Sequence, residues 1–282
     1  MDGCEAQAGG GAAVIVIRSC EGFDELEACV QLQVETWGYD QADLIPRKGF
    51  LVMQKVGGQV IGAFDTDLPG AEANGEAGSM VGFAVSLPGV KSAENFKDGQ
   101  ARPYLHSHML AVKESYRNRG LGAQLKLAQR DEALKRGLRH MEWTFDPLEI
   151  KNAFLNIHKL GAIVRTYRDN FYGVSSSRLQ AGLPTDRLLA EWDLDSERVK
   201  AALAGQSGPP LVIEERIMVP ASIYQWKRDE KERGRARAVQ LENRLKFQEA
   251  FARGLAVLGF ERDEQGNGVF ALGPPGQPGI GI

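Results

Sequence analysis

The stretch Met109-Leu-Ala-Val-Lys-Glu-Ser-Tyr-Arg-Asn-Arg-Gly-Leu-Gly-Ala-Gln-Leu125 decides the expected fold. Its pattern changes from strand-like to helical across a turn that contains Gly120 and Gly122. The first backbone N–H groups of a helix have no intrahelical acceptor and lie at the positive end of the helix dipole. The two glycines leave room for a pyrophosphate to reach these groups, and Arg117 and Arg119 add positive charge. We therefore expect an anion-binding turn between a strand and a helix.

The sequence on both sides of this turn predicts one mixed sheet covered by helices. Before the turn, the predicted elements are a strand at 14–18, a helix at 23–37, strands at 50–55 and 59–65 that form a hairpin through Gly57-Gly58, a strand at 79–87 ended by Pro88-Gly89, and a strand at 104–112. After it come a helix at 122–135, a strand at 138–145, a helix at 152–160, and strands at 162–167 and 188–194. Hairpin strands followed by strand–helix crossovers indicate an α+β fold with a central mixed sheet.

The last third of the chain predicts a small C-terminal α+β subdomain. Glycines and prolines in 195–210 indicate a boundary between a first domain at 14–195 and an appendage at 211–272. The appendage is expected to contain a strand at 211–219, a helix from Ser222 that bends near Gly234 and ends at Gly254, and a hairpin built from 255–260 and 269–272. The apolar side of its helix is expected to pack on either the first domain or a second subunit of a homodimer. A flexible leader is expected at 1–13 and a flexible tail at 273–282.

The composition excludes several classes of protein. The 282 residues are 43% hydrophobic and 25% charged, which is typical of a soluble globular chain. A net charge of −3 gives no reason to expect a nucleic-acid partner. Three cysteines without a CxxC pair indicate neither a disulfide framework nor a zinc site. The sequence contains no signal peptide or membrane-spanning run, so a cytoplasmic protein is expected.

The turn also resembles a known family signature. The spacing of Arg117, Gly120 and Gly122 is similar to the (Gln/Arg)-x-x-Gly-x-(Gly/Ala) motif of the GNAT superfamily of N-acyltransferases, as are the lead-in Leu110-Ala-Val112 and the element order through residue 194. Further stretches resemble one bacterial branch of the superfamily: His106-Ser-His108, Trp143-Thr-Phe-Asp-Pro147, Asn152 with Asn156, Asn170-Phe-Tyr-Gly173 and Gly182-Leu-Pro-Thr-Asp-Arg187. The dinucleotide fingerprint is not met, because Leu125 occupies the place of its third glycine.

The resemblance implies that an acyl group, with acetyl the expected one, moves from acyl-CoA to an amine of a small molecule by direct attack, without a metal. It implies that backbone at Leu110 and Val112 binds the pantetheine arm. The residues expected at the rest of the cofactor are Arg117, Arg119, Gly120, Leu121, Gly122, Ala123, Asn152 and Asn156. For Asn152 itself, the preferred expectation is that it caps its helix.

Two histidines are candidates for the base that removes the amine proton. His106 and His108 lie on the strand before the turn, and period-two alternation predicts that they share a face with Leu110 and Val112. Histidine titrates near neutrality, which suits a general base. His108 is the preferred candidate, with a structural role in hydrogen bonding as the alternative for both.

The acid expected for the leaving thiolate is where this sequence departs from the family pattern. Relatives use a Tyr in the helix before a Leu-Gly pair, and alignment on Leu160-Gly161 places Ile157 there. Tyr172 is the catalytic candidate in its place, and Asn156, Tyr167 and solvent are alternatives. The missing Tyr favours a second hypothesis, a module that binds acyl-CoA without turnover. A third is acylation of a protein or peptide.

Trp143 and Asp146 are expected to line the acceptor site, because they end the strand at 138–145. Asp146 either holds a cationic amine or makes an Asx turn before Pro147. Asp186 and Arg187 are expected to pair with each other or with substrate.

Overall fold

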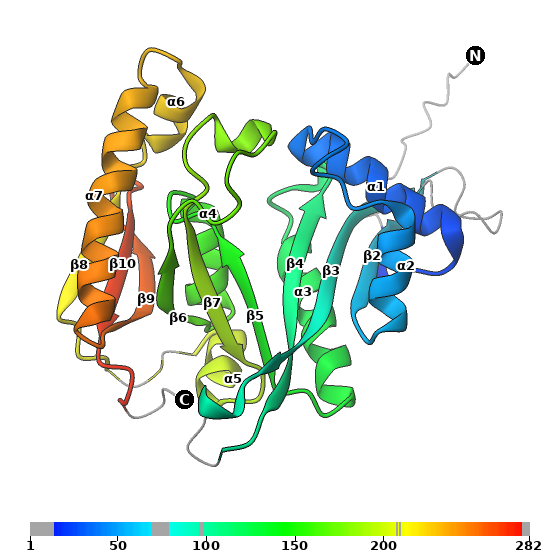
Figure 1. The fold of residues 1–282 in the computed structure, drawn as a ribbon, viewed down its shortest axis with the longest axis horizontal. Helices are drawn as coiled ribbons and strands as arrows, with labels where there is room; N and C mark the ends of the chain where they lie inside the picture. Colours follow the sequence, from blue (N-terminus) through cyan, green and yellow to red (C-terminus); the bar gives the residue numbers. More distant parts are fainter. Residues whose placement is uncertain (1–13, 69–78, 96–98, 207, 209, 278–282) are drawn as a thin grey trace, which may run out of the picture.

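The computed structural model describes residues 14–68, 79–95, 99–206, 208 and 210–277. Within these residues the strands form one ten-stranded sheet (Figure 1). Its order is β1 (Ile15–Ser19), β2 (Gln59–Asp65), β3 (Met80–Lys91), β4 (Arg102–Val112), β5 (His140–Phe145), β7 (Arg187–Asp193), β6 (Ile163–Arg168), β9 (Ala256–Arg262), β10 (Gly268–Gly273) and β8 (Glu215–Val219). Neighbours are antiparallel except β4 and β5, which are parallel. The predicted α+β class is confirmed.

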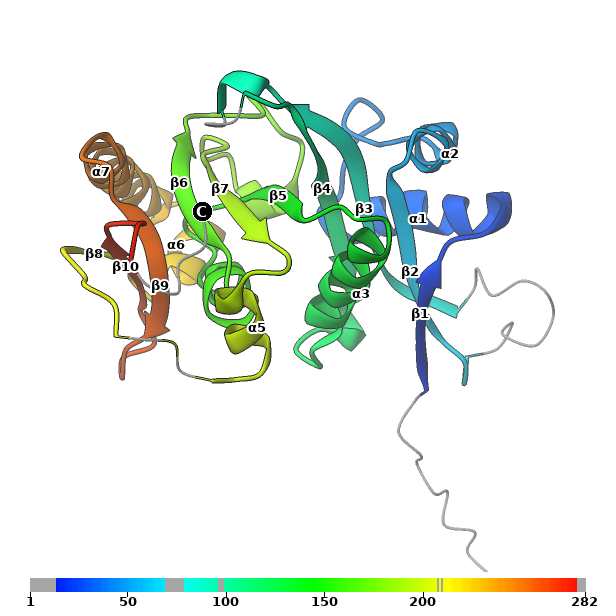
Figure 2. The ribbon, with the colours of Figure 1, turned by 90° about the horizontal axis from the view of Figure 1, so that it is seen from below.

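Helices cover both faces of the sheet. Figure 2 shows α1 (Gly22–Trp37), α2 (Arg47–Lys55) and α7 (Arg233–Ala252) on one side, and α3 (Leu121–Lys135) and α5 (Glu197–Leu203) on the other. The shorter elements are α4 (Ile150–Ala153), which continues as the π-helix η4 (Phe154–Lys159), α6 (Ile223–Arg228), and the 3₁₀ turns η2 (Ala93–Asn95), η3 (Glu114–Tyr116) and η5 (Arg178–Gln180). No helix among the described residues is long and apolar enough to cross a membrane.

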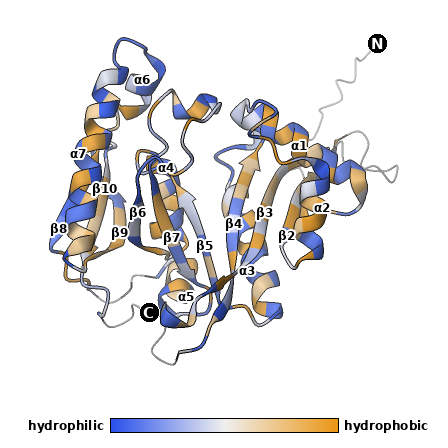
Figure 3. Cartoon of the chain, viewed as in Figure 1, coloured by the Kyte–Doolittle hydropathy of each residue, from blue (hydrophilic) through white to orange (hydrophobic). Residues whose placement is uncertain are grey.

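The hydrophobic core lies between these layers. Phe50 of α2 is buried in one cluster with Phe64 of β2 and Phe83 of β3. The largest cluster joins Trp192 of β7 to Phe247 of α7. Figure 3 shows hydrophobic residues along the strands, where the helices cover them. The core therefore continues from the first part of the chain into the C-terminal part.

In the first half of the chain, one predicted strand is a helix and another strand ends later than predicted. Residues 50–55 belong to α2, so Gly57-Gly58 joins a helix to β2 and is no hairpin turn. A short apolar run has no clear period, and within it Phe50 is buried while Val52 and Lys55 stay exposed. β3 continues through Pro88 to Lys91, because its pairing with β2 ends at Ser86 and leaves the proline with only one neighbouring strand.

The predicted boundary at 195–210 contains α5, whose N-cap Ser196 accepts a hydrogen bond from the Val199 N–H at 3.3 Å. Arg198 of this helix donates to the carbonyl oxygens of Gly161 and Leu258, at 2.8 and 2.5 Å. Burial lowers the pKa of this guanidinium to about 10. Since β9 also pairs with β6, residues 211–272 extend the central sheet.

The C-terminal helix is split between α6 and α7, so its break falls just before Gly234. The leader at 1–13 and the end of the predicted tail at 278–282 lie outside the described residues.

Candidate functional site

The strands β4 and β5 separate early. Their parallel register pairs Leu105 with Met141 and His106 with Glu142, and these are its only pairs although both strands are fully described. We call the end of this pairing the seam. Beyond it, β4 continues to Val112 and β5 to Phe145 along diverging paths (Figure 1). The backbone groups that face each other beyond the seam are therefore available to a ligand.

The glycine turn, residues 117–123, connects β4 to α3. Gly120 is the N-cap of α3 with a φ of 80°, a left-handed conformation that glycine adopts without strain. Gln124 donates its N–H to the Gly120 carbonyl at 3.1 Å. Within the described part of the chain, no acceptor is present for the backbone N–H groups of residues 119–123. These consecutive amides at a helix N-terminus form the expected anion cradle.

Side chains around the glycine turn fix its ends. Arg117 donates its Nε–H to the Val112 carbonyl at 3.1 Å, which holds the turn against the end of β4. The Arg119 guanidinium lies 5.3 Å from the ring centroid of Tyr116. The Tyr116 hydroxyl donates to Asp65 at 2.5 Å, which raises the pKa of this tyrosine. The exposed Arg119 guanidinium therefore provides positive charge at the rim of the glycine turn.

A second rim cation was not found from the sequence. Lys151 of α4 donates from Nζ to the Asn118 side chain at 3.2 Å. Thirty-odd residues separate these two along the chain, and only the packing of α4 beside α3 brings them together. Lys151 and Arg119 therefore add positive charge to the anion cradle.

A β-bulge changes the predicted orientation of the histidines. The register with β3 slips between Ser107 and Met109, which leaves His108 as the extra residue. Ser107 bonds to α3, and Leu110 also faces α3, since a Cβ built on Gly122 would lie 3.7 Å from its methyl group. The prediction that His106 and His108 share a face with Leu110 and Val112 is therefore wrong, because the bulge interrupts the alternation. Both histidines point to the opposite face of the sheet.

We call this opposite face, with His106, His108, Glu142 and Thr144, the histidine face. Burial, together with nearby His106, lowers the pKa of His108 to about 4. His108 is thus neutral at neutral pH and can accept a proton. Burial alone would raise the pKa of Glu142, but His106 and Lys91, at 3.8 and 2.8 Å, lower it to about 2. The ionised Glu142 is therefore already paired.

Tyr172 reaches the histidine face from the loop between β6 and β7. Its hydroxyl is 2.9 Å from Thr144 Oγ1, and the residue is 42% exposed. Its ring also carries the Arg187 guanidinium at 5.3 Å. The fold thus brings all three catalytic candidates to one face, although their separation along the chain gave no indication of it.

Trp143 and Asp146, the predicted acceptor-site residues, are engaged inside the protein. Trp143 faces α3 and lies under Lys126, whose Nζ is 3.7 Å from the ring centroid. Asp146 makes the predicted Asx turn, with the Leu148 N–H at 2.8 Å, and also pairs with Lys227 of α6 at 3.2 Å. Because its carboxylate is nearly buried and already neutralised, the structure favours a structural role for Asp146 over binding of an amine.

The helix before Leu160-Gly161 starts earlier than predicted. α4 begins at Ile150 after the N-cap Glu149, so the prediction that Asn152 caps this helix is wrong, and its side chain is exposed. The following π-helix places Asn156 at 4% exposure and Ile157 at 1% exposure in the core. The position at which relatives carry an acid is thus apolar and buried.

Asp186 pairs with α7 and not with Arg187, so the predicted neighbouring pair is also wrong. Its fully buried carboxylate accepts two hydrogen bonds from Arg244, both at 2.9 Å. It also accepts from the Tyr167 hydroxyl at 2.6 Å and from the Asn170 N–H at 3.0 Å. This ion pair fixes the β6–β7 loop to the C-terminal helix.

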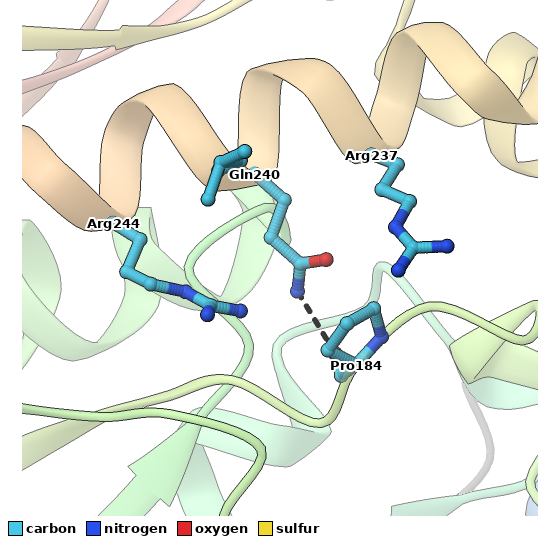
Figure 4. Close-up of a pocket in the computed structure, with 5 residues that line it drawn as sticks. Pro184, Arg237, Gln240 and Arg244 are labelled. Carbon is cyan, nitrogen blue, oxygen red and sulfur yellow. Dashed lines mark hydrogen bonds between the residues drawn. The ribbon is translucent and has the colours of Figure 1, made fainter.

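A shallow depression marks the same contact (Figure 4). It is lined by Pro184 of the loop and by Arg237, Gln240, Leu241 and Arg244 of α7. Gln240 donates from Nε2 to the Pro184 carbonyl at 2.9 Å. No residue of the glycine turn or the histidine face lines this depression, so we assign it to the loop's attachment and not to catalysis.

We expect Arg244→Met to lower the free energy of unfolding by about 2 kcal/mol, because it leaves the Asp186 carboxylate buried without a counter-charge. This loss of stability is at the low end for a broken buried ion pair. The Tyr167 and Asn170 donors still bond to the carboxylate, and Arg244 is partly exposed. Urea denaturation measures it. Arg237→Met, on the same helix but without a carboxylate partner among the described residues, is the control and is expected to change stability by less than about 0.5 kcal/mol.

The β6–β7 loop also contacts α1 and the loop that follows it. Ser176 donates its hydroxyl to Asp43 at 2.6 Å and accepts the Asp40 N–H at 3.2 Å. Arg178 donates to the Glu35 carbonyl at 3.0 Å. These bonds bridge the two halves of the sheet across the separation of β4 and β5.

Residues 23–156 match the acetyltransferase (GNAT) family. Residues 23–156 therefore form an acetyltransferase (GNAT) domain, and the class of reaction of this family is acyl transfer. The match includes β4, the glycine turn, α3 and β5, the parts that the geometry singles out. A comparison with curated proteins finds no match.

Several solved structures match this chain at low sequence identity. NAA60 of Arabidopsis thaliana in complex with acetyl-CoA is 15% identical, with a TM-score of 0.50 over 64% of this chain and 98% of that one. The ribosomal-protein-S18-alanine N-acetyltransferase from Escherichia coli is 18% identical, with a TM-score of 0.46 over 71% and 99%. The putative acetyltransferase yncA from Salmonella typhimurium with acetyl-CoA is 17% identical, with a TM-score of 0.44 over 71% and 100%. At this identity the likeness to NAA60 supports the fold alone.

Proposed function

We propose that the protein transfers an acyl group, with acetyl the expected one, from acyl-CoA to the amine of a small molecule. The observation that carries this proposal is the row of unpaired amides at residues 119–123, beside two strands that separate at the seam. The amides suit the CoA pyrophosphate, and the free edge of β4 at Leu110 and Val112 suits the pantetheine amides. The acetyl-CoA complex of NAA60, which shares the fold, supports the choice of donor.

The histidine face provides a site for the acceptor. The amine nitrogen attacks the thioester carbon, the N–C bond forms, and the C–S bond breaks. The neutral His108 takes the proton that the amine loses. The thiolate leaves with CoA and takes up a proton in turn.

A small acceptor is supported by the bridge between the β6–β7 loop and the loop after α1. Ser176 and Arg178 span the separation of the two strands, which narrows the approach to the histidine face. A folded protein surface would need a wider opening. Tyr172 and Arg187 lie beside this approach and are available to contact the acceptor.

Thermal unfolding with acetyl-CoA tests the donor. At a concentration 100 times Kd, a specific ligand adds about 2.7 kcal/mol to the stability, which corresponds to about 5 °C for a protein of this size. Release of free thiol from acetyl-CoA across a panel of small amines then tests turnover. The absence of any shift at millimolar acetyl-CoA would contradict the proposal.

A second candidate is an acyl-CoA-binding module without turnover. The buried Ile157, in the place where relatives carry an acid, favours it. A thermal shift without thiol release for any amine or peptide would support this alternative.

A further inference from the structure

A buried lysine occupies the seam. Lys126 lies in α3 and is 4% exposed. Its Nζ donates to Ser107 Oγ at 2.8 Å and lies 3.7 Å from the ring centroid of Trp143. No carboxylate of the described residues pairs with it. A buried amine thus has only a hydroxyl and an aromatic face as its partners among the described residues.

The two partners define its place in the site. Ser107 directly follows the last paired residue of β4, and Trp143 directly follows that of β5. Nζ therefore lies on the α3 side of the point where the strands begin to separate. In the proposed function, the pantetheine arm extends from the glycine turn along β4 toward this point, and the thioester sulfur ends beside it.

The groups around Lys126 provide no counter-charge for an ammonium. The Ser107 hydroxyl donates to Gln129 Oε1 at 2.9 Å, while Gln129 Nε2 is buried without a partner. Glu132 is the acid of the same helix face, but it bonds to Gln59 and to Arg136. On β4, His106 and His108 point to the opposite face. Burial lowers the pKa of Lys126 well below its usual value, so its ammonium gives up a proton more readily than that of an exposed lysine.

Burying an amine without a counter-charge reduces the stability of the fold. A function at this position would explain why a lysine is present. An apolar residue at position 126 would pack on Trp143 without the desolvation cost of an amine. Buried ionisable groups with perturbed acidity are concentrated at functional sites. The role that the site lacks is a proton donor for the thiolate, since Ile157 has none.

We propose that Lys126 is the acid of this transferase: its Nζ ammonium gives a proton to the CoA sulfur as the C–S bond breaks. The lysine becomes a neutral amine and the sulfur a thiol. The proton lost by the acceptor amine is on His108, and exchange with solvent after CoA leaves restores both groups. This inference rests on the proposed function, because it requires CoA to bind along β4.

Titration of the bound CoA thiol tests the contact without a known acceptor. Thiolate absorbs in the ultraviolet, so absorbance of the CoA complex against pH reports its ionisation, with desulfo-CoA as the blank. A lysine ammonium beside the sulfur favours the thiolate. We expect the wild-type protein to lower the pKa of the CoA thiol by about one unit or more, a tenfold change in its acidity.

Lys126→Met and Lys126→Gln are expected to return the thiol to its value in free CoA, with Kd for CoA changed less than about threefold. Methionine fills the same space, so Lys126→Met is also expected to unfold at the same or a higher temperature. Lys135→Met, at the exposed end of the same helix, is the control and should retain the wild-type titration. The glutamine variant gives the same test if the methionine variant does not fold.

The outcomes distinguish the role of Lys126 from the proposed function. Tight binding of CoA with an unshifted thiol in the wild-type protein overturns the role of Lys126 and leaves the proposed function intact. A shift that survives in both Lys126 variants also overturns it. Failure of the wild-type protein to bind CoA overturns the proposed function, and the role of Lys126 with it.

Discussion

Gly122→Val is expected to raise the Kd for acetyl-CoA at least about 100-fold while the protein stays folded. Gly122 is the second residue of α3, and its amide is one of the unpaired donors of the cradle. A Cβ at this position would meet only methyl groups of Leu110 and Leu155, at 3.7 and 3.9 Å, which are ordinary contacts. The branched methyls would instead occupy the space that a pyrophosphate needs to reach the amides. Isothermal titration with acetyl-CoA measures the loss.

A matched control exists elsewhere in the chain. Gly234 is the second residue of α7, and no atom lies within 4 Å of a Cβ built there. Glycine and valine differ by only a few tenths of a kcal/mol in helix propensity, so both variants should unfold near the wild-type temperature. Gly234→Val should bind acetyl-CoA normally. Normal binding by Gly122→Val as well would mean that the glycine turn is not the pyrophosphate site.

His108→Ala is expected to lower kcat about 100-fold or more, which is the usual contribution of a general base. The Kd for acetyl-CoA should change less than about twofold, because the β-bulge directs His108 away from the face of Leu110 and Gly122. Steady-state kinetics with any amine that turns over, together with direct binding of acetyl-CoA, separates the two effects. An unchanged kcat would assign His108 to structure.

The pH dependence provides an independent test of this base. Burial and nearby His106 lower the pKa of His108 to about 4, so its neutral, proton-accepting form persists well below pH 6.5. On the acidic side, kcat for the enzyme–substrate complex should therefore not fall with the midpoint near 6.5 of an ordinary histidine. The loss should come as the pH approaches about 4. A midpoint near 6.5 would point to a different, solvent-exposed base.

Local sequence signals predicted much of the fold. The glycine turn, the strand before it and the helix after it follow from glycine positions and from a change of period over a few residues. The order of strands and helices through residue 194 follows from the same kind of signal, except at residues 50–55. The hairpin proposed at Gly57-Gly58 was wrong because a run of six residues does not distinguish a strand from a short buried helix.

The features that the sequence could not predict depend on neighbours in space. The bulge at His108 exists only in the register of β4 with β3, so alternation along β4 gave the wrong face. Lys126 resembles any other lysine of an amphipathic helix until Trp143 and Ser107 are packed around it. The partner of Asp186 is likewise distant in the chain, which is why the adjacent arginine was preferred.

The Asp186–Arg244 ion pair has a consequence for how this protein can be modified. The β6–β7 loop, which carries Tyr172, is attached to a helix that lies beyond the family match. Transplanting this loop into a relative without α7 would leave an uncompensated acid in the recipient's interior. Transfer of acceptor preference between such proteins would therefore require two segments together. These are the β6–β7 loop and the C-terminal part of the chain that carries α7.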